Sequence, residues 1–296
     1  MHFLAKLTTH PWKPAAWLRV SGSDAATFLQ GQFTNELRGL GPGGAVYGLW
    51  LDVKGRVLAD SFVLGGPRAG EFWVGSYFSP ATTVRARLES FIIADDVVIE
   101  DLTNEWTGVA LLGAGAAAAL AAEPREGFVF RGRRAREENA EWVFPIASAD
   151  AVRARLAGLR ELDSNKITRL RIDAGIPAVP ADIGPADLPN EGGLDTEAIS
   201  YTKGCYLGQE VMARLKAMGQ ARRRLLRVTG AGEPFPKLPA ALFAGERRVG
   251  ELRSAARDGS GGFIGLAMLS LLHVTKDAAL AFAADAAPTV RLMDAP

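Results

Sequence analysis

The sequence predicts an α+β protein with two lobes of the antiparallel-sheet and helix type, followed by a small C-terminal β-barrel. Three observations support this fold class. Strand and helix patterns follow the order β, α, β, β, β, α, β up to residue 103, and a similar order recurs between residues 104 and 218. The texture then changes near residue 219 to short strands separated by turns. We therefore expect three parts, at residues 1–103, 104–218 and 219–296.

The first lobe is predicted to begin with a strand at residues 16–20 and a helix over residues 25–37. Polar residues near the end of this helix, among them Asn35, either contact a ligand or are solvated. The following elements are strands at 45–51 and 56–64, a strand at 71–74, a helix over 80–93 and a strand at 97–100. The sequence Asp52-Val53-Lys54-Gly55 between the second and third strands is typical of a hairpin turn.

The second lobe is predicted from a comparable series of elements. Strands are expected at 106–112, 127–130 and 141–145, with helices over 115–122 and 149–159. The run Arg131-Gly132-Arg133-Arg134-Ala135-Arg136 falls in its loops, where a solvated face is the main interpretation and an anionic partner the alternative. A helix over 166–174 precedes the proline-rich residues 177–202, a long irregular segment of the kind that tends to be functional.

The third part has the pattern of a small barrel. Its predicted strands are 225–228, 241–243, 249–254, 263–269, 279–282 and 289–292, separated by glycine, proline or charged residues.

Composition excludes several classes of protein. The chain has 296 residues, 48% apolar and 23% charged, with a net charge of +1, so it has no overall attraction for nucleic acid or acidic membranes. One cysteine excludes an internal disulfide, and with only three histidines we expect no self-contained metal site. We see neither a secretory signal nor an apolar run of the roughly 20 residues that a membrane span needs, so we expect a cytoplasmic protein without membrane contact.

The only cysteine, Cys205, lies in the segment Tyr-Thr-Lys-Gly-Cys-Tyr-Leu-Gly-Gln-Glu at residues 201–210. Glycines at 204 and 208 favour a bent segment that lines a cavity. The ammonium of Lys203 would favour a thiolate, which makes Cys205 and Lys203 the candidate reactive pair. Polar groups beside them that are candidates for ligand contact are Tyr206, Gln209 and Glu210. The alternative is that the cysteine is a small buried apolar residue.

The eight residues Lys-Gly-Cys-Tyr-Leu-Gly-Gln-Glu resemble the signature of the YgfZ family, folate-binding proteins linked to iron-sulfur cluster maturation and tRNA modification. Weaker similarity runs from about Leu18 to the C-terminus. That family is similar in turn to the aminomethyltransferase (T-protein) of the glycine cleavage system. The resemblance implies lobes of the aminomethyltransferase folate-binding type, tetrahydrofolate or a one-carbon derivative as cofactor, and iron-sulfur client or assembly proteins as partners.

The resemblance also implies binding residues outside the cysteine segment. Aminomethyltransferases hold the pterin through a glutamate in a Pro-x-Glu context, which is similar to Pro189-Asn190-Glu191 in this chain. An ionised carboxylate accepts the pterin amino group and ring N–H together through charge-assisted bonds. We therefore expect Glu191 to anchor the pterin. Among Arg222, Arg223 and Arg224, we choose Arg223 to pair with the glutamyl tail of folate, the alternative being a strand that faces water.

The chain also departs from the aminomethyltransferase pattern. Those enzymes have an aspartate where this chain has Cys205, and they carry two adjacent aspartates where it has Ala59-Asp60. Only Asp60 is present, so the acid apparatus of the transferase is incomplete. The resemblance supports a folate site that includes Asp60 better than it supports the transfer reaction.

The leading hypothesis is a folate-binding protein that assists assembly or repair of iron-sulfur clusters, including those of tRNA-modifying enzymes, with Cys205 as its reactive group. The rival is a folate-dependent aminomethyltransferase or demethylase, which would depend on Asp60. A third hypothesis, direct tRNA binding, depends on the arginines at 131–136, and the near-neutral net charge disfavours it.

Overall fold

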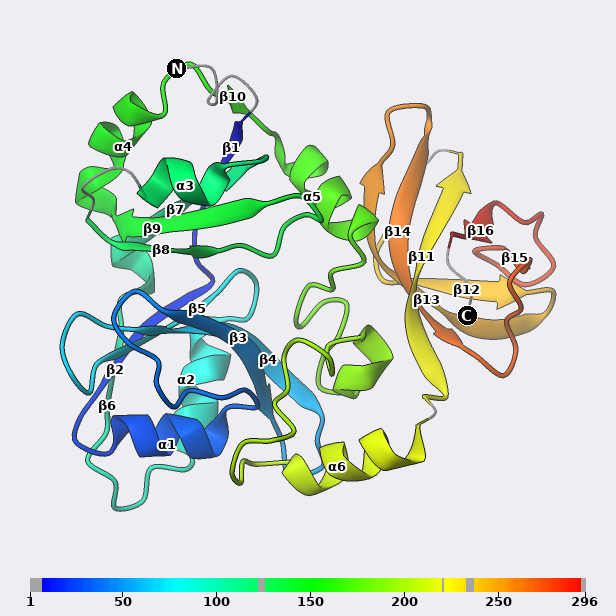
Figure 1. The fold of residues 1–296 in the computed structure, drawn as a ribbon. Coiled ribbons are helices and arrows are strands. Elements are labelled where there is room, and N and C mark those ends of the chain that lie inside the picture. Colours follow the sequence, from blue (N-terminus) through cyan, green and yellow to red (C-terminus); the bar gives the residue numbers. More distant parts are fainter. Residues whose placement is uncertain (1–6, 122–125, 220, 233–236, 294–296) are drawn as a thin grey trace.

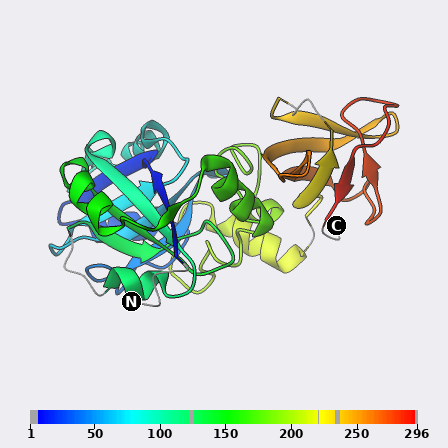
Figure 2. The same ribbon diagram turned by 90° about the horizontal axis from the view of Figure 1, so that it is seen from above.

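The computed structural model of the chain describes residues 7–121, 126–219, 221–232 and 237–293. Figure 1 shows two α+β lobes, one above the other, and a separate β-barrel on the side of the C-terminus. A long irregular segment runs between the lobes and the barrel, and Figure 2 shows the same arrangement from above.

The first lobe is a five-stranded antiparallel sheet covered by two helices. Its strands are β2 (Ala16–Ser21), β3 (Ala45–Leu51), β4 (Val57–Gly65), β5 (Phe72–Ser76) and β6 (Val98–Asp101), and its helices are α1 (Ala25–Gln32) and α2 (Ala81–Glu89). The strands lie in the order β3-β4-β5-β2-β6. Buried apolar side chains of both helices, such as Leu29 and Val84, pack with those of the strands in one cluster. The predicted order of elements is confirmed.

Helix α1 ends earlier than predicted. Phe33 adopts an extended conformation with φ −90° and ψ 142°, and it forms an isolated bridge with Trp50. Residues 33–37 therefore leave the helix, and Phe33 and Thr34 run along the edge strand β3.

The second lobe is also five-stranded. Its elements are β1 (Thr8–Trp12), η2 (Thr103–Glu105), β7 (Trp106–Leu112), α3 (Ala116–Ala121), β8 (Phe128–Arg131), β9 (Asn139–Pro145), η3 (Ile146–Ser148), α4 (Ala149–Arg155) and β10 (Arg160–Glu161). The strand order is β10-β1-β7-β9-β8. Strand β1, which falls within residues 1–103, pairs with β7 and β10 of this second sheet. Ala122, where the predicted helix over 115–122 ends, lies outside the described residues.

The C-terminal part is a six-stranded sheet that curves into a nearly closed barrel. Its strands are β11 (Arg223–Ala231), β12 (Ala240–Ala244), β13 (Arg247–Arg257), β14 (Gly262–Ser270), β15 (Ala279–Leu280) and β16 (Val290–Leu292), in the order β12-β13-β14-β11-β16-β15. A bridge between Phe243 and Ala281 links the two ends of this order. The predicted barrel is confirmed.

The connection between the second lobe and the barrel contains three short helices. They are α5 (Ser164–Asp173), η4 (Pro189–Gly192) and α6 (Gln209–Met218). Helix α5 contacts the barrel, because Asn165 Nδ2 donates to Arg257 O at 3.1 Å. Helix α6 begins inside the cysteine segment and was not predicted. We call the residues between α5 and α6, 174–208, the central segment.

Aromatic side chains join the two lobes. Trp17, Phe62 and Trp73 of the first sheet pack in one buried cluster with Phe130 and Val143 of the second. Large aromatic rings bury much apolar area and prefer tilted or edge-on contacts, as between Phe62 and Phe130, whose ring centroids are 4.8 Å apart. This buried cluster packs between the two sheets and fixes them relative to each other.

Candidate functional site

The segment that contains Cys205 lies along the end of α1, where Leu207 N donates to Gly31 O at 3.3 Å. Gly208 precedes α6 with φ +86°, and a Cβ there would lie 3.0 Å from Asp52 O, so this position requires glycine. Cys205 itself is exposed. The fold therefore presents the thiol at the surface, and the alternative of a buried apolar cysteine is wrong.

Lys203 is buried, and its ammonium points at the end of α1 rather than serving the thiol. Its Nζ donates to Gln30 O at 2.7 Å, Phe33 O at 2.6 Å and Asn35 O at 2.9 Å. A lysine ammonium has three protons, so none is left for a hydrogen bond to Cys205. The ammonium that was expected to favour a thiolate at Cys205 is thus bonded to backbone carbonyls, and its effect on the thiol stays a prediction. Burial lowers the pKa of Lys203 to about 8.

Asn35 connects this helix end to the space between the lobes. Its Nδ2 donates to Tyr47 O at 2.9 Å and to Glu197 O at 3.0 Å. Beside it, the buried hydroxyl of Thr34 donates to Ala198 O at 2.7 Å. Asn35 thus binds to backbone on two sides, and its side-chain amide is used for these contacts.

A pocket of about 360 Å³ lies between the lobes and the central segment. Its chemically distinctive lining residues are Tyr47, Phe62, Arg131, Arg133, Arg136 and Glu197. We call it the inter-lobe pocket. Three arginines of the run at 131–136 line it, and two of them, Arg131 and Arg136, are exposed to solvent, so a solvated face and contact with an anionic partner both stay predictions.

Asp60 lies directly behind Tyr47. The Tyr47 hydroxyl donates to Asp60 Oδ2 at 3.0 Å, and the hydroxyls of Ser76 and Ser79 donate to Oδ1 at 2.8 and 2.7 Å. Burial raises the pKa of the Asp60 carboxyl, although the three hydroxyls act in the opposite direction. Asp60 therefore orients a residue of the pocket wall and does not itself line the pocket.

Arg133 forms one wall of the inter-lobe pocket. Its guanidinium lies 3.7 Å from the centroid of the Tyr47 ring and forms an ion pair with Glu197. Stacking on an aromatic face orients the guanidinium and keeps its remaining N–H groups available in one plane.

Glu141 lies under the pocket lining and was not recognised from the sequence. It is fully buried, and its Oε1 accepts from Arg134 Nε at 2.8 Å and from the Tyr77 hydroxyl at 2.8 Å. Its Oε2 has no hydrogen-bond partner among the described residues. A Cβ on Gly132, which lines the pocket, would lie 2.7 Å from Glu141 Oε1, so the backbone at 132 packs directly on this carboxylate, and Glu141 itself does not line the pocket.

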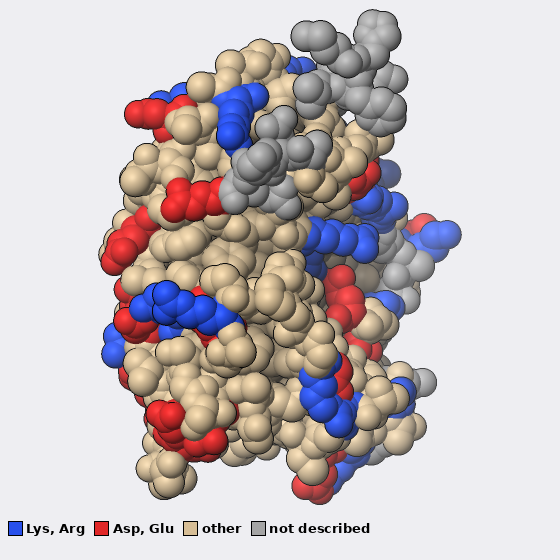
Figure 3. All heavy atoms as spheres, turned by 60° about the vertical axis from the view of Figure 1, so that its left-hand side comes forward, with Lys and Arg blue, Asp and Glu red and all other residues tan. Residues whose placement is uncertain are grey.

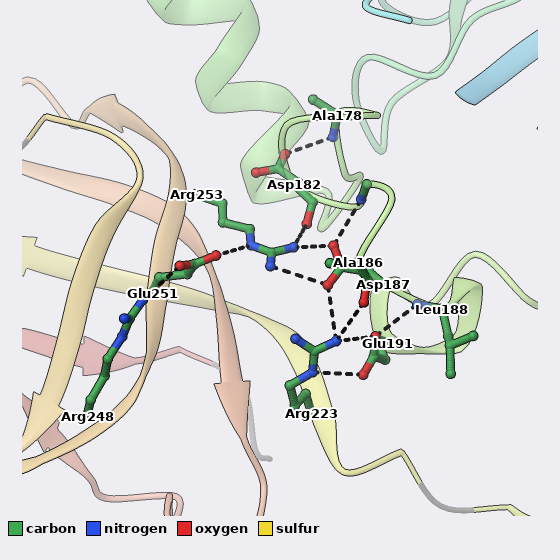
Figure 4. Close-up of polar contacts among 11 residues, drawn as sticks. Ala178, Asp182, Ala186, Asp187, Leu188, Glu191, Arg223, Arg248, Glu251 and Arg253 are labelled. Atoms are coloured by element: carbon green, nitrogen blue, oxygen red, sulfur yellow. Dashed lines mark hydrogen bonds and ion pairs between the residues drawn. The ribbon is translucent and has the colours of Figure 1, made fainter. Parts of the chain in front are cut away.

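A second group of charges joins the central segment to the barrel (Figure 4). Asp187 is buried and accepts from two arginines, Arg253 at 2.6 Å and Arg223 at 3.2 Å. Arg253 also donates to Glu251 Oε1 at 2.9 Å. Both arginines come from barrel strands, so these ion pairs hold the barrel against the central segment.

Glu191 belongs to this barrel contact. Arg223 Nε and Nη2 donate to its two oxygens at 3.0 and 2.9 Å, and Leu188 N donates to Oε2 at 2.9 Å. Glu191 and Arg223, expected to hold the two ends of folate, are therefore bonded to each other. Neither lines the inter-lobe pocket. In the structure this pair fastens the barrel, since both carboxylate oxygens accept from the guanidinium of Arg223, and the expected roles of the two residues in folate binding stay predictions.

The remaining candidates lie on the cysteine side of the central segment. Tyr206 is buried in the apolar cluster beneath Cys205, and burial raises its pKa to about 12. Its hydroxyl has no hydrogen-bond partner among the described residues. Gln209 and Glu210 form the first turn of α6, and Glu210 is exposed beside Arg214. None of the three lines the inter-lobe pocket.

Charges of both signs are interspersed on the face drawn in Figure 3, with no continuous basic area. Within the described ranges, no helix has the length and apolar character needed to cross a membrane. In the same part of the chain, no group of three or more His, Cys, Asp or Glu side chains is placed to hold a metal ion. Cys205 therefore contributes at most one ligand to any metal.

Comparison with known families gives two matches. Residues 14–127 match the GCVT N-terminal domain, and residues 222–295 match the CAF17 C-terminal beta-barrel domain. Among solved structures, the glycine cleavage system aminomethyltransferase T of Bartonella henselae superimposes with a TM-score of 0.79, covering 99% of this chain and 87% of that one. The two sequences are 19% identical, so this likeness shows the fold alone.

Two groups of relatives match along most of the chain. The mouse protein named iron-sulfur cluster assembly factor IBA57, mitochondrial, is 30% identical over 86% of this chain and 75% of its own length. The tRNA-modifying protein YgfZ of Edwardsiella ictaluri is 31% identical over 88% of this chain and 82% of its own length. The human IBA57 protein is 31% identical over 85% of this chain and 74% of its own length.

Proposed function

Because the chain belongs to the family of YgfZ and IBA57, we propose that it is a folate-binding protein that assists iron-sulfur cluster assembly or repair and thereby tRNA modification. The names of these relatives support the cluster and tRNA parts of the proposal. The observation that carries it is that one segment serves both sites: Glu197 lines the inter-lobe pocket, and Cys205 is exposed eight residues later.

The inter-lobe pocket fits the chemistry of tetrahydrofolate or a one-carbon derivative. A folate has a flat pterin with an amino group and ring N–H, and a tail that ends in carboxylates. The arginines at 131, 133 and 136 suit the tail, since guanidinium groups pair with carboxylates, and the rings of Tyr47 and Phe62 suit a flat body. When bound, folate supplies a carrier for one-carbon units.

Glu141 is the residue we propose for the pterin end. Its unpaired Oε2 suits an amino donor, because a buried acceptor without a partner costs about 1–3 kcal/mol that a ligand N–H can recover. The backbone of Gly132, which lines the pocket, packs directly on this carboxylate. Asp60 and Asn35 orient Tyr47, which lines the pocket, through hydrogen bonds to its hydroxyl and its backbone carbonyl.

Cys205 is proposed as the reactive group. One exposed thiol can exchange with another thiol, supply one ligand to iron, or react with a one-carbon fragment on folate. Because the described residues offer no further cluster ligands nearby, the other ligands come from an iron-sulfur client or assembly protein. The effect on tRNA is proposed to pass through such a client.

Two matched substitutions test the pocket assignment. Glu141→Gln and Glu191→Gln each remove a buried carboxylate that is bonded to an arginine. We expect Glu141→Gln to weaken binding of 5-formyltetrahydrofolate about tenfold or more in calorimetric titration, and Glu191→Gln to leave the affinity nearly unchanged. Absence of binding by the unsubstituted protein at millimolar folate contradicts the proposal.

The role of the thiol is tested in cells. Cys205→Ala removes the only sulfhydryl and leaves the pocket residues in place. We expect normal folate affinity and loss of the activity of an iron-sulfur enzyme in cells that depend on this protein. Full enzyme activity with the alanine variant would remove Cys205 from the function.

A further inference from the structure

The side chain of Lys203 lies between the two parts of the proposed site. On one side it is two residues from Cys205, within the segment that lies along α1. On the other side its ammonium donates to Asn35 O, and the amide of Asn35 donates to the backbone of Tyr47 and Glu197. Both of these residues line the inter-lobe pocket. A continuous series of hydrogen bonds therefore joins the pocket wall to the cysteine segment.

We propose that Lys203 couples occupancy of the inter-lobe pocket to the position and reactivity of the Cys205 thiol. Lys203 is in this sense a positioning residue that acts through the segment it holds. The inference rests on the proposed folate function, because it names how the two parts of that site communicate.

The end of α1 explains why a lysine is needed. A helix C-terminus leaves carbonyl groups without partners and carries partial negative charge, which a cation stabilises. Lys203 serves the carbonyls of Gln30 and Phe33 in this way, with distances of 2.7 and 2.6 Å. The same ammonium bonds to Asn35 O, beyond the helix end, so one group fixes the helix end, the Asn35 turn and the cysteine segment together.

Ligand binding can act on this arrangement through either wall residue. A folate that bonds to the Arg133–Glu197 pair or stacks on Tyr47 shifts the backbone to which Asn35 donates. Coupling requires that the ligand prefers one position of this wall, and the equilibrium is reciprocal: the position of the segment that folate favours is also the position that binds folate more tightly.

The single cysteine makes the coupling measurable. Iodoacetamide labels only Cys205, because the chain contains no other thiol. The labelling rate, followed by mass spectrometry, is compared with and without saturating 5-formyltetrahydrofolate. We expect folate to change the rate about threefold or more in the unsubstituted protein. In Lys203→Met we expect the same rate with and without folate, and a loss of folate affinity no larger than that factor.

A matched control and a second variant complete the test. Lys216→Met removes an exposed lysine of α6 that stacks on Tyr201, 4.0 Å from the ring centroid, and it must keep the folate-dependent rate. Asn35→Ala cuts the link to Tyr47 and Glu197 while leaving the carbonyl that Lys203 contacts, and it must lose the folate dependence. Asn35→Ala decides the matter if Lys203→Met does not fold.

The outcomes separate this inference from the proposed function. Folate binding without any effect on the labelling rate, or a full effect in Lys203→Met, overturns the coupling and leaves the folate function standing. A purely electrostatic role of Lys203 also overturns it, and would appear as a shifted pH profile of labelling in Lys203→Met with the folate effect retained. Absence of folate binding by the unsubstituted protein overturns both proposals.

Discussion

Glu191 and Arg223 face each other across the contact between the central segment and the barrel, with both carboxylate oxygens within 3.0 Å of guanidinium nitrogens. The Glu191 side chain is 9% exposed and that of Arg223 is 40% exposed, so the pair is only partly shielded from water. This two-point contact, together with Asp187, ties β11 to the loop at 186–191.

We predict that Glu191→Gln destabilises the protein by about 1–3 kcal/mol, because Arg223 loses one of its two charged partners at a half-buried site and keeps only Asp187. The measurement is the free energy of unfolding in urea. Glu210→Gln is the control, since its side chain is 91% exposed and its arginine lies 3.6 Å away, and its unfolding midpoint should not move. Equal stability of both variants would show that the barrel contact does not depend on this pair.

The two glycines beside Cys205 allow a matched prediction. Gly208→Ala places a Cβ 3.0 Å from Asp52 O at φ +86°, so we expect a loss of stability of about 1–2 kcal/mol. Gly204 has no heavy atom within 4 Å of an added Cβ, so Gly204→Ala should be nearly neutral. Thermal unfolding of the two variants, with Cys205 labelling as a second readout, checks the difference. Similar effects of both substitutions would contradict the assigned backbone conformation.

Arg133 is predicted to contribute to folate binding through charge. Arg133→Met keeps an apolar stem in the pocket wall and removes the guanidinium, so we expect about tenfold weaker binding of 5-formyltetrahydrofolate. Arg153→Met is the control, because this arginine is 78% exposed on α4 and pairs with Asp150. Calorimetry on both proteins compares the two losses, and equal affinities would remove Arg133 from the site.

Lys203 gives a prediction about pH. Burial lowers the pKa of the Lys203 ammonium from 10.5 to about 8, while the charge of Glu36 raises it and that of Arg38 lowers it. The neighbouring Tyr206 has a pKa raised to about 12, so its phenol stays neutral over this pH range. Between pH 8 and 10.5 the unfolded chain then binds more protons than the folded one, so stability rises with pH in this window. Each pKa unit corresponds to about 1.4 kcal/mol, which sets an upper limit of about 3.5 kcal/mol on the gain.

Urea unfolding of the unsubstituted protein and of Lys203→Met at several pH values tests this. The difference in free energy of unfolding between them should grow in favour of the unsubstituted protein from pH 8 to 10. The opposite slope would mean that the three carbonyl contacts stabilise the ammonium more than burial destabilises it.

The sequence predicted the fold better than the site. Alternating apolar residues and turn residues predicted nearly every strand of the first sheet and of the barrel, because each of these patterns lies within a few consecutive residues. Strand β1 was missed because Thr-Thr-His-Pro-Trp has no apolar alternation, and it is stabilised by partners on both sides that lie about 100 and 150 residues later. Such pairing is decided by tertiary contacts.

Site residues could be predicted from the sequence where a short motif was sufficient. They were missed where the bonding partner lies far away along the chain. The glycine-bracketed segment predicted that Cys205 lines a cavity. The thiol is exposed, but it is not among the residues that line the inter-lobe pocket. The acceptors of Lys203 lie 168 to 173 residues earlier and are backbone atoms, which no side-chain pattern reveals. Glu191 was chosen for its Pro-x-Glu context, but the equally plausible carboxylate of Glu141 carried no local signal, since its significance comes from Gly132 and the opposite lobe.

The solitary sulfhydryl at the surface has a consequence for how the protein meets oxidants. With no second thiol in the chain, a disulfide formed there must join it to another molecule: a small thiol, a client, or a second copy through a twofold-symmetric link. Each such adduct is chemically uniform, so air-exposed preparations should separate into a few sharp species on non-reducing gels, and reductant should return them all to one band.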